Sequence, residues 1–416
     1  MDRSNKGLAQ NTGFVLAAEL LVQATRAVTV FVLLDVFDPE EFAAYAAILA
    51  LTTLLGPVSQ WGMNHVGVRA IARDVPFADT WAKVTSSVAV GGVLGTAVAV
   101  IIAWLIYDVP LAIVWAFGLA QLVGFGTAQA ATLMTEAHHR SDIGLRINIA
   151  GGVVRIGLLV LFVGLGFDRL EQWALFLLIG MLVWGAVSAI QVSRAFGGRF
   201  RLAAPTREDL GHGFGFVFVL TSASGQTDID KVVLEANGLS NDLANYSPGY
   251  RIAELTTVPL IALVRATYAE FFRRGKTTIT EAMSFAKGLT VIATGYGALA
   301  GVGLLLFAPL VNIVIDEAKL PDTVNAVRWL AFIPIVKGLQ YFPGNALTGS
   351  DHHKVRSWII FITAAVNLVG NLIFIPGNGW RAAAVTTLVS EVLFAVLLWA
   401  AAIYLSSKEE VVLETG

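Results

Sequence analysis

The feature that most constrains this chain is a series of long apolar runs that recurs from one end of the sequence to the other. A run of about 20 apolar residues crosses the hydrocarbon core of a bilayer as an α-helix, which satisfies its backbone polar groups internally. The first run is too long for a signal peptide, so we expect it to be a retained span. The sequence predicts twelve spans, at 12–36, 41–66, 84–107, 111–134, 145–167, 173–195, 213–236, 246–271, 284–308, 323–347, 357–376 and 381–405.

The composition agrees with a polytopic membrane protein and excludes several kinds of site. Only 14% of the residues are charged and the mean hydropathy is +0.71, whereas soluble proteins carry about 25% charged residues. There are no cysteines, which excludes disulfides and thiolate chemistry. We find no catalytic constellation, no GxxxxGK[ST] motif and no histidines at metal-ligand spacing. We therefore expect no catalytic residues, metal, bound nucleotide or nucleic-acid partner.

The basic residues are distributed unevenly between the two sides of the predicted spans. Eighteen Lys and Arg residues lie in or beside the connections on one side, and only Arg169, Lys319 and Arg381 lie on the other. Connections rich in Lys and Arg face the cytoplasm. We therefore expect a multi-pass protein of the cytoplasmic membrane with both termini in the cytoplasm.

The chain divides into two halves with equal numbers of predicted spans. The longest polar connection, 194–212, separates an N-terminal lobe at 1–193 from a C-terminal lobe at 213–416. The segment FDPEEFAAY, from Phe37, matches GLSNDLANY, from Gly238, at an offset of 201 residues. Six spans in each half give both halves one orientation and a pseudo-two-fold axis along the membrane normal. The predicted fold is all-α, with two six-helix lobes around a central cavity where transporters of this design bind substrate.

Charged residues gather on the seventh and eighth predicted spans. Asp228, Lys231 and Glu235 share one helical face with Thr221 and Ser224. Charges at bilayer depth are costly, so they line a cavity or pair with each other. This stripe therefore predicts the wall of an aqueous cavity or a group of charges that balance among themselves.

The same stretch carries a recognisable pattern. Asp230-Lys231 lies late in the seventh span, and Tyr246 and Tyr250-Arg251 open the eighth. In this pattern, and in FDPEEFAAYAAILALTTLLGPVSQWGMNHVGVR of the first half, the chain resembles the polysaccharide flippase family of the multidrug/oligosaccharidyl-lipid/polysaccharide (MOP) exporter superfamily. The likeness extends over the whole chain.

The resemblance implies a fold and a function. Two six-helix lobes would form a V around a central cavity. Alternating access would move an undecaprenyl-diphosphate-linked oligosaccharide from the inner to the outer leaflet, for the synthesis of a cell-surface polysaccharide. Other membrane proteins of polysaccharide assembly are candidate partners.

A diphosphate substrate calls for cations in the membrane. Arginine suits this task because its forked guanidinium matches phosphate oxygens. We expect Arg26 and Arg251 to contact the substrate, with Arg265 nearer the cytoplasmic mouth. The further candidates are Glu19, Gln23, Lys231, Glu254, Arg155 and Lys337. The alternative is local ion pairing, of Arg26 with Glu19 and of Arg251 with Glu254.

Coupling to a cation gradient would need carboxylates in the membrane, with amide and hydroxyl oxygens around them. The C-terminal half supplies such a set in Asp228, Asp230, Asn367, Asn371, Thr387 and Glu391. They form a candidate site for Na⁺ or H⁺, and no other cofactor is expected. The alternative is that Asp230 neutralises Lys231 and that the asparagines bond between helices.

Three other functions are open to a chain of this kind. A multidrug or cation antiporter of the same superfamily is disfavoured because buried cations repel cationic drugs. A membrane polysaccharide polymerase would expose catalytic residues in a large loop, which this sequence lacks. A passive channel is disfavoured by the two-lobe repeat and the buried charges. We therefore expect a transporter and not an enzyme.

Overall fold

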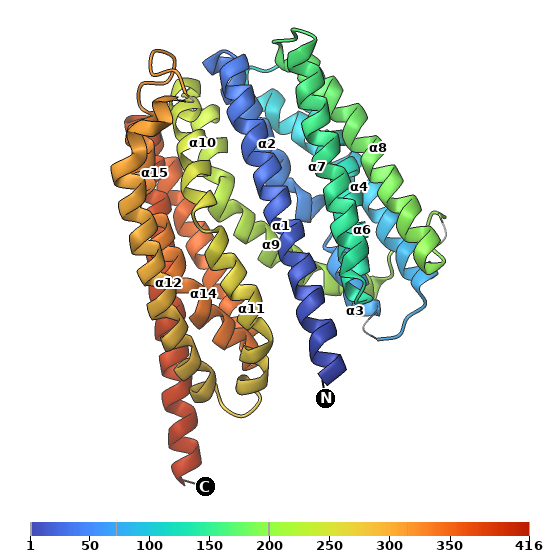
Figure 1. The fold of residues 1–416 in the computed structure, drawn as a ribbon, viewed down its shortest axis with the longest axis vertical. Coiled ribbons are helices and arrows are strands. Elements are labelled where there is room, and N and C mark those ends of the chain that lie inside the picture. Colours follow the sequence, from blue (N-terminus) through green and yellow to red (C-terminus); the bar gives the residue numbers. More distant parts are fainter. Residues whose placement is uncertain (1, 72, 199, 314, 416) are drawn as a thin grey trace. The chain divides into compact units, whose positions relative to one another are not determined.

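The computed structural model describes residues 2–71, 73–198, 200–313 and 315–415, except the side chains of 2–16, 18, 19, 269 and 410–415. Over these residues the regular structure is entirely helical (Figure 1). The helices are α1 (Asp2–Val36), α2 (Pro39–Ser59), α3 (Met63–Ile71), α4 (Phe77–Ile106), α5 (Leu111–Gly118), the π-helix η1 (Leu119–Phe125), α6 (Gly126–Ala137), α7 (Ser141–Gly164), α8 (Leu170–Phe196), α9 (Arg207–Ala236), α10 (Ser240–Leu255), α11 (Val258–Gly275), α12 (Ile279–Phe307), the 3₁₀-helix η2 (Ala308–Ile313), α13 (Thr323–Leu330), α14 (Ile333–Gly349) and α15 (His353–Thr415).

The chain forms two compact units. Unit 1 comprises Met1–Ser224 and Glu235–Ser240, and unit 2 comprises Gly225–Leu234 and Asn241–Gly416. In unit 1, α1 packs along α7, and α8 packs on η1. In unit 2, α12, α14 and α15 lie side by side (Figure 1). Helix α9 contributes its first turns to unit 1 and its charged turns to unit 2.

The all-helical prediction is confirmed, and several predicted spans are built from more than one helix. The span predicted at 41–66 consists of α2 and α3, which a turn at Gln60–Gly62 separates. The spans predicted at 246–271 and 323–347 are the pairs α10–α11 and α13–α14. The second member of each of these two pairs begins with a proline in its first turn, where a missing N–H costs nothing.

Seven helical segments are long and apolar enough to cross a membrane, as judged over the described residues. They are Pro39–Ser59, Phe77–Ile106, Leu111–Ala137, Ser141–Gly164, Leu170–Phe196, Ile279–Ile313 and His353–Glu409. Helix α9 is long but too polar, because its second half carries Asp228, Asp230 and Lys231. Candidate functional residues thus lie both on helices outside this set, such as Lys231 on α9, and on helices within it, such as Arg155 on α7 and Glu391 on α15.

Small residues bring helices into close contact where the sequence contains Gly-xxx-Gly pairs. A Cβ atom on Gly91 would lie 1.9 Å from the carbonyl oxygen of Ser59, so α4 touches the end of α2. A Cβ atom on Gly297 would lie 2.4 Å from the carbonyl oxygen of Pro334, so α12 touches the start of α14 in the same way. Such contacts replace the hydrophobic driving force that helices lack in lipid.

A glycine breaks α15 at the point where the sequence predicts the end of one span and the start of the next. Gly379 has φ 57° and ψ −140°, a conformation open almost only to glycine. Its Cα faces the carboxylate of Asp242, which accepts a bond of 3.3 Å from the backbone N–H of Trp380. The break turns α15 into two helical segments that pack within unit 2.

Candidate functional site

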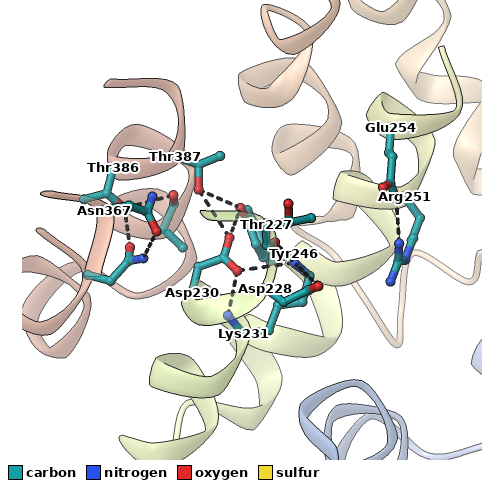
Figure 2. Close-up of polar contacts among 12 residues, drawn as sticks. Thr227, Asp228, Asp230, Lys231, Tyr246, Arg251, Glu254, Asn367, Thr386 and Thr387 are labelled. Atoms are coloured by element: carbon teal, nitrogen blue, oxygen red, sulfur yellow. Dashed lines mark hydrogen bonds and ion pairs between the residues drawn. The ribbon is translucent and has the colours of Figure 1, made fainter. Parts of the chain in front are cut away.

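The charged turns of α9 hold a lysine that is almost completely buried. Lys231 is 2% exposed. Its Nζ donates 2.6 Å to the carbonyl oxygen of Thr227 and lies 3.2 Å from Oδ1 of Asp228 and 3.3 Å from Oδ1 of Asp230. Thr227 and Asp228 stand one helical turn before Lys231, so the spacing of the sequence itself brings them to the ammonium (Figure 2).

Asp230 joins this lysine to two other helices of unit 2. Its Oδ2 accepts 2.6 Å from the hydroxyl of Tyr246 on α10 and 3.3 Å from Oγ1 of Thr387 on α15. Its Oδ1 also accepts 2.8 Å from the backbone N–H of Lys231. Asp230 is 1% exposed, so this carboxylate is held by protein donors instead of water.

Two aromatic rings of α10 lie against the ammonium group of Lys231. The Nζ of Lys231 lies 4.1 Å from the centroid of the Tyr250 ring and 6.0 Å from that of Tyr246. Both tyrosines are buried. A desolvated ammonium over an aromatic face gains more from this contact than an exposed one. We call this group the Lys231 cluster; it comprises Thr227, Asp228, Asp230, Lys231, Tyr246, Tyr250 and Thr387.

Two further ion pairs lie in unit 2. Arg251 Nη1 donates 2.5 Å to Oε2 of Glu254, the local pairing that the sequence offered as an alternative to substrate contact. Lys337 Nζ donates 2.7 Å to Oε1 of Glu391, whose Oε2 accepts 2.5 Å from Gln340. The two cations are similarly exposed, and the pairs differ in their carboxylates: the side chain of Glu254 is 32% exposed, whereas that of Glu391 is 3% exposed.

The predicted asparagines bond between the two segments of α15. Asn367 Nδ2 donates 3.0 Å to Ser390 Oγ, and Asn371 Nδ2 donates 3.0 Å to Asn367 Oδ1. Thr386 Oγ1 donates to Asn371 Oδ1. The six candidate coupling residues thus divide into three groups: Asp228, Asp230 and Thr387 in the Lys231 cluster, Asn367 and Asn371 in this chain of amides, and Glu391 with Lys337.

Unit 1 contains a buried arginine in a different setting. Arg155 on α7 is 7% exposed. Its hydrogen-bond contact is a distant one, 4.0 Å from Nη2 to the sulfur of Met181 on α8. Among the side chains that the structure describes, no carboxylate forms an ion pair with Arg155. A buried cation without a counter-ion is costly, so such groups mark sites for anions or for charge transfer.

A second arginine lies close enough to Arg155 for the two charges to repel each other. This is Arg26 on α1, whose guanidinium carbon lies 5.1 Å from the centroid of the Phe125 ring. Phe125 ends the π-helix η1 and contacts Trp184, with ring centroids 6.0 Å apart. π-Helical turns are rare and occur often at functional sites. Unit 1 thus brings two predicted cations, Arg26 and Arg155, to one place.

The other predicted substrate contacts are distributed as follows. Gln23 on α1 and Arg265 on α11 are both half-buried. Glu19 lies outside the side chains that the structure describes. Its predicted pairing with Arg26 therefore stays a prediction.

Two contributors were not anticipated from the sequence. Gln340 shares a helical face with Lys337 because it follows at i+3, so the signal for its contact with Glu391 was present. Phe125 gave no signal, because a π-turn changes which residues of a helix share a face. Over the described residues, no group of three or more His, Asp or Glu side chains is arranged to hold a metal ion.

A family model described as "polysaccharide biosynthesis protein" matches residues 8–271 of the chain. This match covers more than half of the sequence, including η1, Arg26, Arg155 and most of the Lys231 cluster. No protein of curated function matches the sequence.

Solved structures of transporters match nearly the whole chain. An inward-facing multidrug-resistance MATE family transporter of the MOP superfamily has a TM-score of 0.70 at 15% identity, covering 96% of each chain. An outward-facing MATE structure has a TM-score of 0.66 at 16% identity, covering 97% of this chain and 96% of the other. A MOP superfamily transporter from Pyrococcus furiosus, described by the reverse polarity of its binding pocket, has a TM-score of 0.63 at 15% identity over 95% of each chain.

At these identities the structural matches establish the fold, and the family model establishes the family. Together they confirm the resemblance that the Asp-Lys and Tyr-Arg patterns indicated. The chain is a multi-pass membrane protein with the fold of the MOP superfamily transporters, and it belongs to the polysaccharide biosynthesis protein family.

Proposed function

We propose that this protein is a flippase that carries a diphosphate-linked lipid oligosaccharide from the inner to the outer leaflet of the cytoplasmic membrane. The observation that carries the proposal is Arg155, a buried guanidinium of unit 1 that lies near Arg26 and has no carboxylate partner among the described side chains. A buried guanidinium and a half-buried one offer the kind of donors that a diphosphate needs in place of water. Membership in a polysaccharide biosynthesis family supports the glycan part of the substrate.

Alternating access is the mechanism that we propose for this transport. The fold occurs in related transporters in both inward-facing and outward-facing conformations. The excess of Lys and Arg in the connections on one side supports a cytoplasmic location of both termini. Undecaprenyl diphosphate is the lipid carrier that the family resemblance implies. We propose no catalytic step, since transport requires only that substrate be bound and released.

The main competing function is export of cationic drugs, which the MATE relatives suggest. Two cations in unit 1, the half-buried Arg26 and the buried Arg155, oppose it, because they would repel a positively charged substrate. One relative of this fold is itself described by reversed pocket polarity and by a different function. This description supports the use of charge within the fold to distinguish between the two proposed substrate classes.

A cation gradient is the energy source that we propose for the cycle. The carboxylates of unit 2, Asp228, Asp230 and Glu391, are the candidate groups for coupling to Na⁺ or H⁺. All three carboxylates are buried, and each lies beside a lysine that neutralises it. Binding or release of one cation would therefore change the net charge of a buried group of residues, which is costly in a membrane. Transport that ignores both Na⁺ and pH gradients would exclude this part of the proposal.

Depletion of the protein in cells tests the proposed function. We expect lipid-linked oligosaccharide to accumulate on the inner leaflet and surface polymer to disappear, while sensitivity to cationic drugs stays unchanged. Re-expression of the wild-type chain serves as the control and should reverse both effects. Normal polymer without accumulation, or a loss of drug resistance alone, would overturn the proposal.

A further inference from the structure

The ammonium of Lys231 is bound in the manner of a coordinated cation. An ammonium group has three N–H donors and no acceptor. Three oxygens surround Nζ at 2.6, 3.2 and 3.3 Å, one each from Thr227, Asp228 and Asp230. The Tyr250 ring covers it at 4.1 Å. All donors are therefore satisfied in a place that is 2% exposed.

The surrounding groups are the kind that a hard metal cation selects. The oxygens around Nζ are two carboxylate oxygens and one backbone carbonyl oxygen, which are ligands that hard cations take. The hydroxyls of Tyr246 and Thr387 donate to the other oxygen of Asp230 and so support this shell from behind. Without the lysine, this shell would hold two buried negative charges and would attract a cation from solution.

The lysine is permanently attached to this shell. Thr227 and Asp228 precede it by one turn of α9, and Asp230 is its neighbour in the chain. A second cation entering the cluster would meet the ammonium at short range in a medium of low dielectric constant, where like charges repel strongly. Lys231 thus both neutralises the carboxylates and blocks access to them.

We propose that the ammonium of Lys231 occupies the cation position of the Lys231 cluster, so that the natural protein does not bind Na⁺ there, and that removal of this side chain converts the cluster into a Na⁺ site. The inference goes beyond the proposed function and concerns its coupling ion. It gives Lys231 a role in ion selectivity, in place of the substrate contact that the sequence predicts. At this cluster it leaves the proton as the coupling ion, since a proton can bind a carboxylate without displacing the ammonium.

The test compares Na⁺ binding to purified full-length variants without any glycan substrate, so its outcome is independent of the flippase proposal. Thermal unfolding is measured in NaCl and in N-methyl-glucamine chloride at equal ionic strength, together with binding of radioactive ²²Na⁺. Wild type is expected to show no difference between the two salts and no bound ²²Na⁺. The melting temperature of Lys231→Ala is expected to be about 3 °C or more higher in NaCl than in N-methyl-glucamine chloride. The reason is that Na⁺, at a concentration well above its dissociation constant, stabilises the folded protein to which it binds.

Two controls separate a Na⁺ site from a general effect of salt. In the triple variant Lys231→Ala, Asp228→Asn, Asp230→Asn, the Na⁺ response should disappear because the carboxylates are gone. Lys337→Ala removes a half-buried lysine, whose partner is the single carboxylate of Glu391, and should lower stability equally in both salts.

Three results would overturn the inference. The first is specific Na⁺ binding by wild type that Asp230→Asn removes. The second is a folded Lys231→Ala protein that does not distinguish Na⁺ from N-methyl-glucamine. The third is an equal Na⁺ response in Lys231→Ala and in the triple variant. If Lys231→Ala fails to fold, the wild-type measurement with ²²Na⁺ still decides, because the inference requires that no such ion binds.

Discussion

At the scale of single residues, this protein places its cations in two different environments. Lys231 and Lys337 in unit 2 each lie against carboxylates, so their charge is neutralised within the protein. Arg155 in unit 1 has a methionine sulfur as its hydrogen-bond contact. The contrast matters because a neutralised cation attracts an anionic substrate far less than one whose counter-ion must arrive from outside.

Arg155→Met tests the role of this guanidinium, since it keeps an apolar stem and removes the charge. We expect the affinity for a lipid-linked diphosphate oligosaccharide to fall about 10- to 100-fold, because charge-assisted hydrogen bonds contribute about 1.5–3 kcal/mol each. Arg155→Lys should retain part of the affinity, because the lysine ammonium keeps the positive charge but lacks the forked donors of the guanidinium. Equilibrium binding of a fluorescent substrate to purified protein measures both.

Arg356→Met is the matched control for that experiment. Arg356 is a half-buried arginine of unit 2 that donates 2.9 Å to the hydroxyl of Thr348. Its loss should change substrate affinity by less than about 3-fold, well below the effect of losing a charge-assisted contact. If Arg155→Met binds substrate as well as wild type, or if both variants lose affinity equally, Arg155 has no particular role in recognition.

At the scale of helices, a few local bonds decide where elements begin and break. The start of α9 carries a reciprocal cap: the backbone N–H of Asp209 donates 3.2 Å to Thr206 Oγ1, and the backbone N–H of Thr206 donates 2.9 Å to Asp209 Oδ2. Lys83 on α4 donates 2.7 Å to the same carboxylate oxygen. This cap anchors the helix that later carries the Lys231 cluster.

The cap of α9 should make stability depend on pH. Burial raises the pKa of Asp209, but hydrogen bonds from Lys83 and Thr206 outweigh burial and bring this pKa below its ordinary value of 3.8. A carboxyl whose pKa is lower in the folded state stabilises the protein above its unfolded pKa, and this contribution is lost as the pH falls through the folded value. Asp209→Asn should lower the stability by about 0.5–1 kcal/mol at pH 7.

Thermal unfolding of wild type and Asp209→Asn at pH 7 and pH 3 checks this expectation. The difference between the two proteins should shrink at pH 3, because the wild-type carboxyl then begins to bind a proton. A difference that is equal at both pH values would show that the charge of Asp209 does not contribute.

The break in α15 gives a second test at this scale. Gly379→Ala should lower the free energy of unfolding by about 1–3 kcal/mol, because its backbone conformation is strained for residues with a side chain. The new Cβ would also lie 2.7 Å from the carboxylate oxygens of Asp242. Gly377→Ala is the control, since a Cβ there meets nothing within 4 Å. Equal melting temperatures for the two variants would contradict this role of Gly379.

The sequence predicts the helices of this protein better than their interruptions. Apolar runs define how long a spanning segment is, and each predicted span contains helix. Breaks are harder to predict because proline acts in two ways here. Pro259 and Pro334 start new helices, whereas Pro248 and Pro343 lie inside helices that continue. Only packing around each proline decides between these outcomes.

The candidate site was predictable only where contacts are local. The pairing of Lys231 with Asp228 follows from the i, i+3 spacing on one helix. The bonds of Asp230 to Tyr246 and Thr387 join residues 16 and 157 positions apart in the chain. Such contacts depend on how each helix rotates about its axis, which hydropathy does not determine. For the same reason, the sequence could not show that Arg155 has no carboxylate partner among the side chains that the structure describes.

At the scale of the whole molecule, two compact units divide the charged residues between them. Unit 2 holds a set of lysines and carboxylates that largely neutralise one another, and unit 1 holds Arg155 near Arg26. In a flippase, we expect the first set to respond to a cation and the second to the substrate. The proposed function therefore assigns the response to a cation to unit 2 and the binding of substrate to unit 1.

Reconstitution in liposomes tests the central claim most directly. Purified protein is incorporated into vesicles with a fluorescent lipid-linked diphosphate oligosaccharide, and transfer is measured as the fraction of substrate that an external quencher can reach. Wild type should transfer this substrate and should leave an uncharged glycolipid of the same glycan where it was placed, while Arg155→Met should lose most of the transfer. Absence of transfer by folded wild type, or equal transfer of the charged and uncharged lipids, would contradict the account.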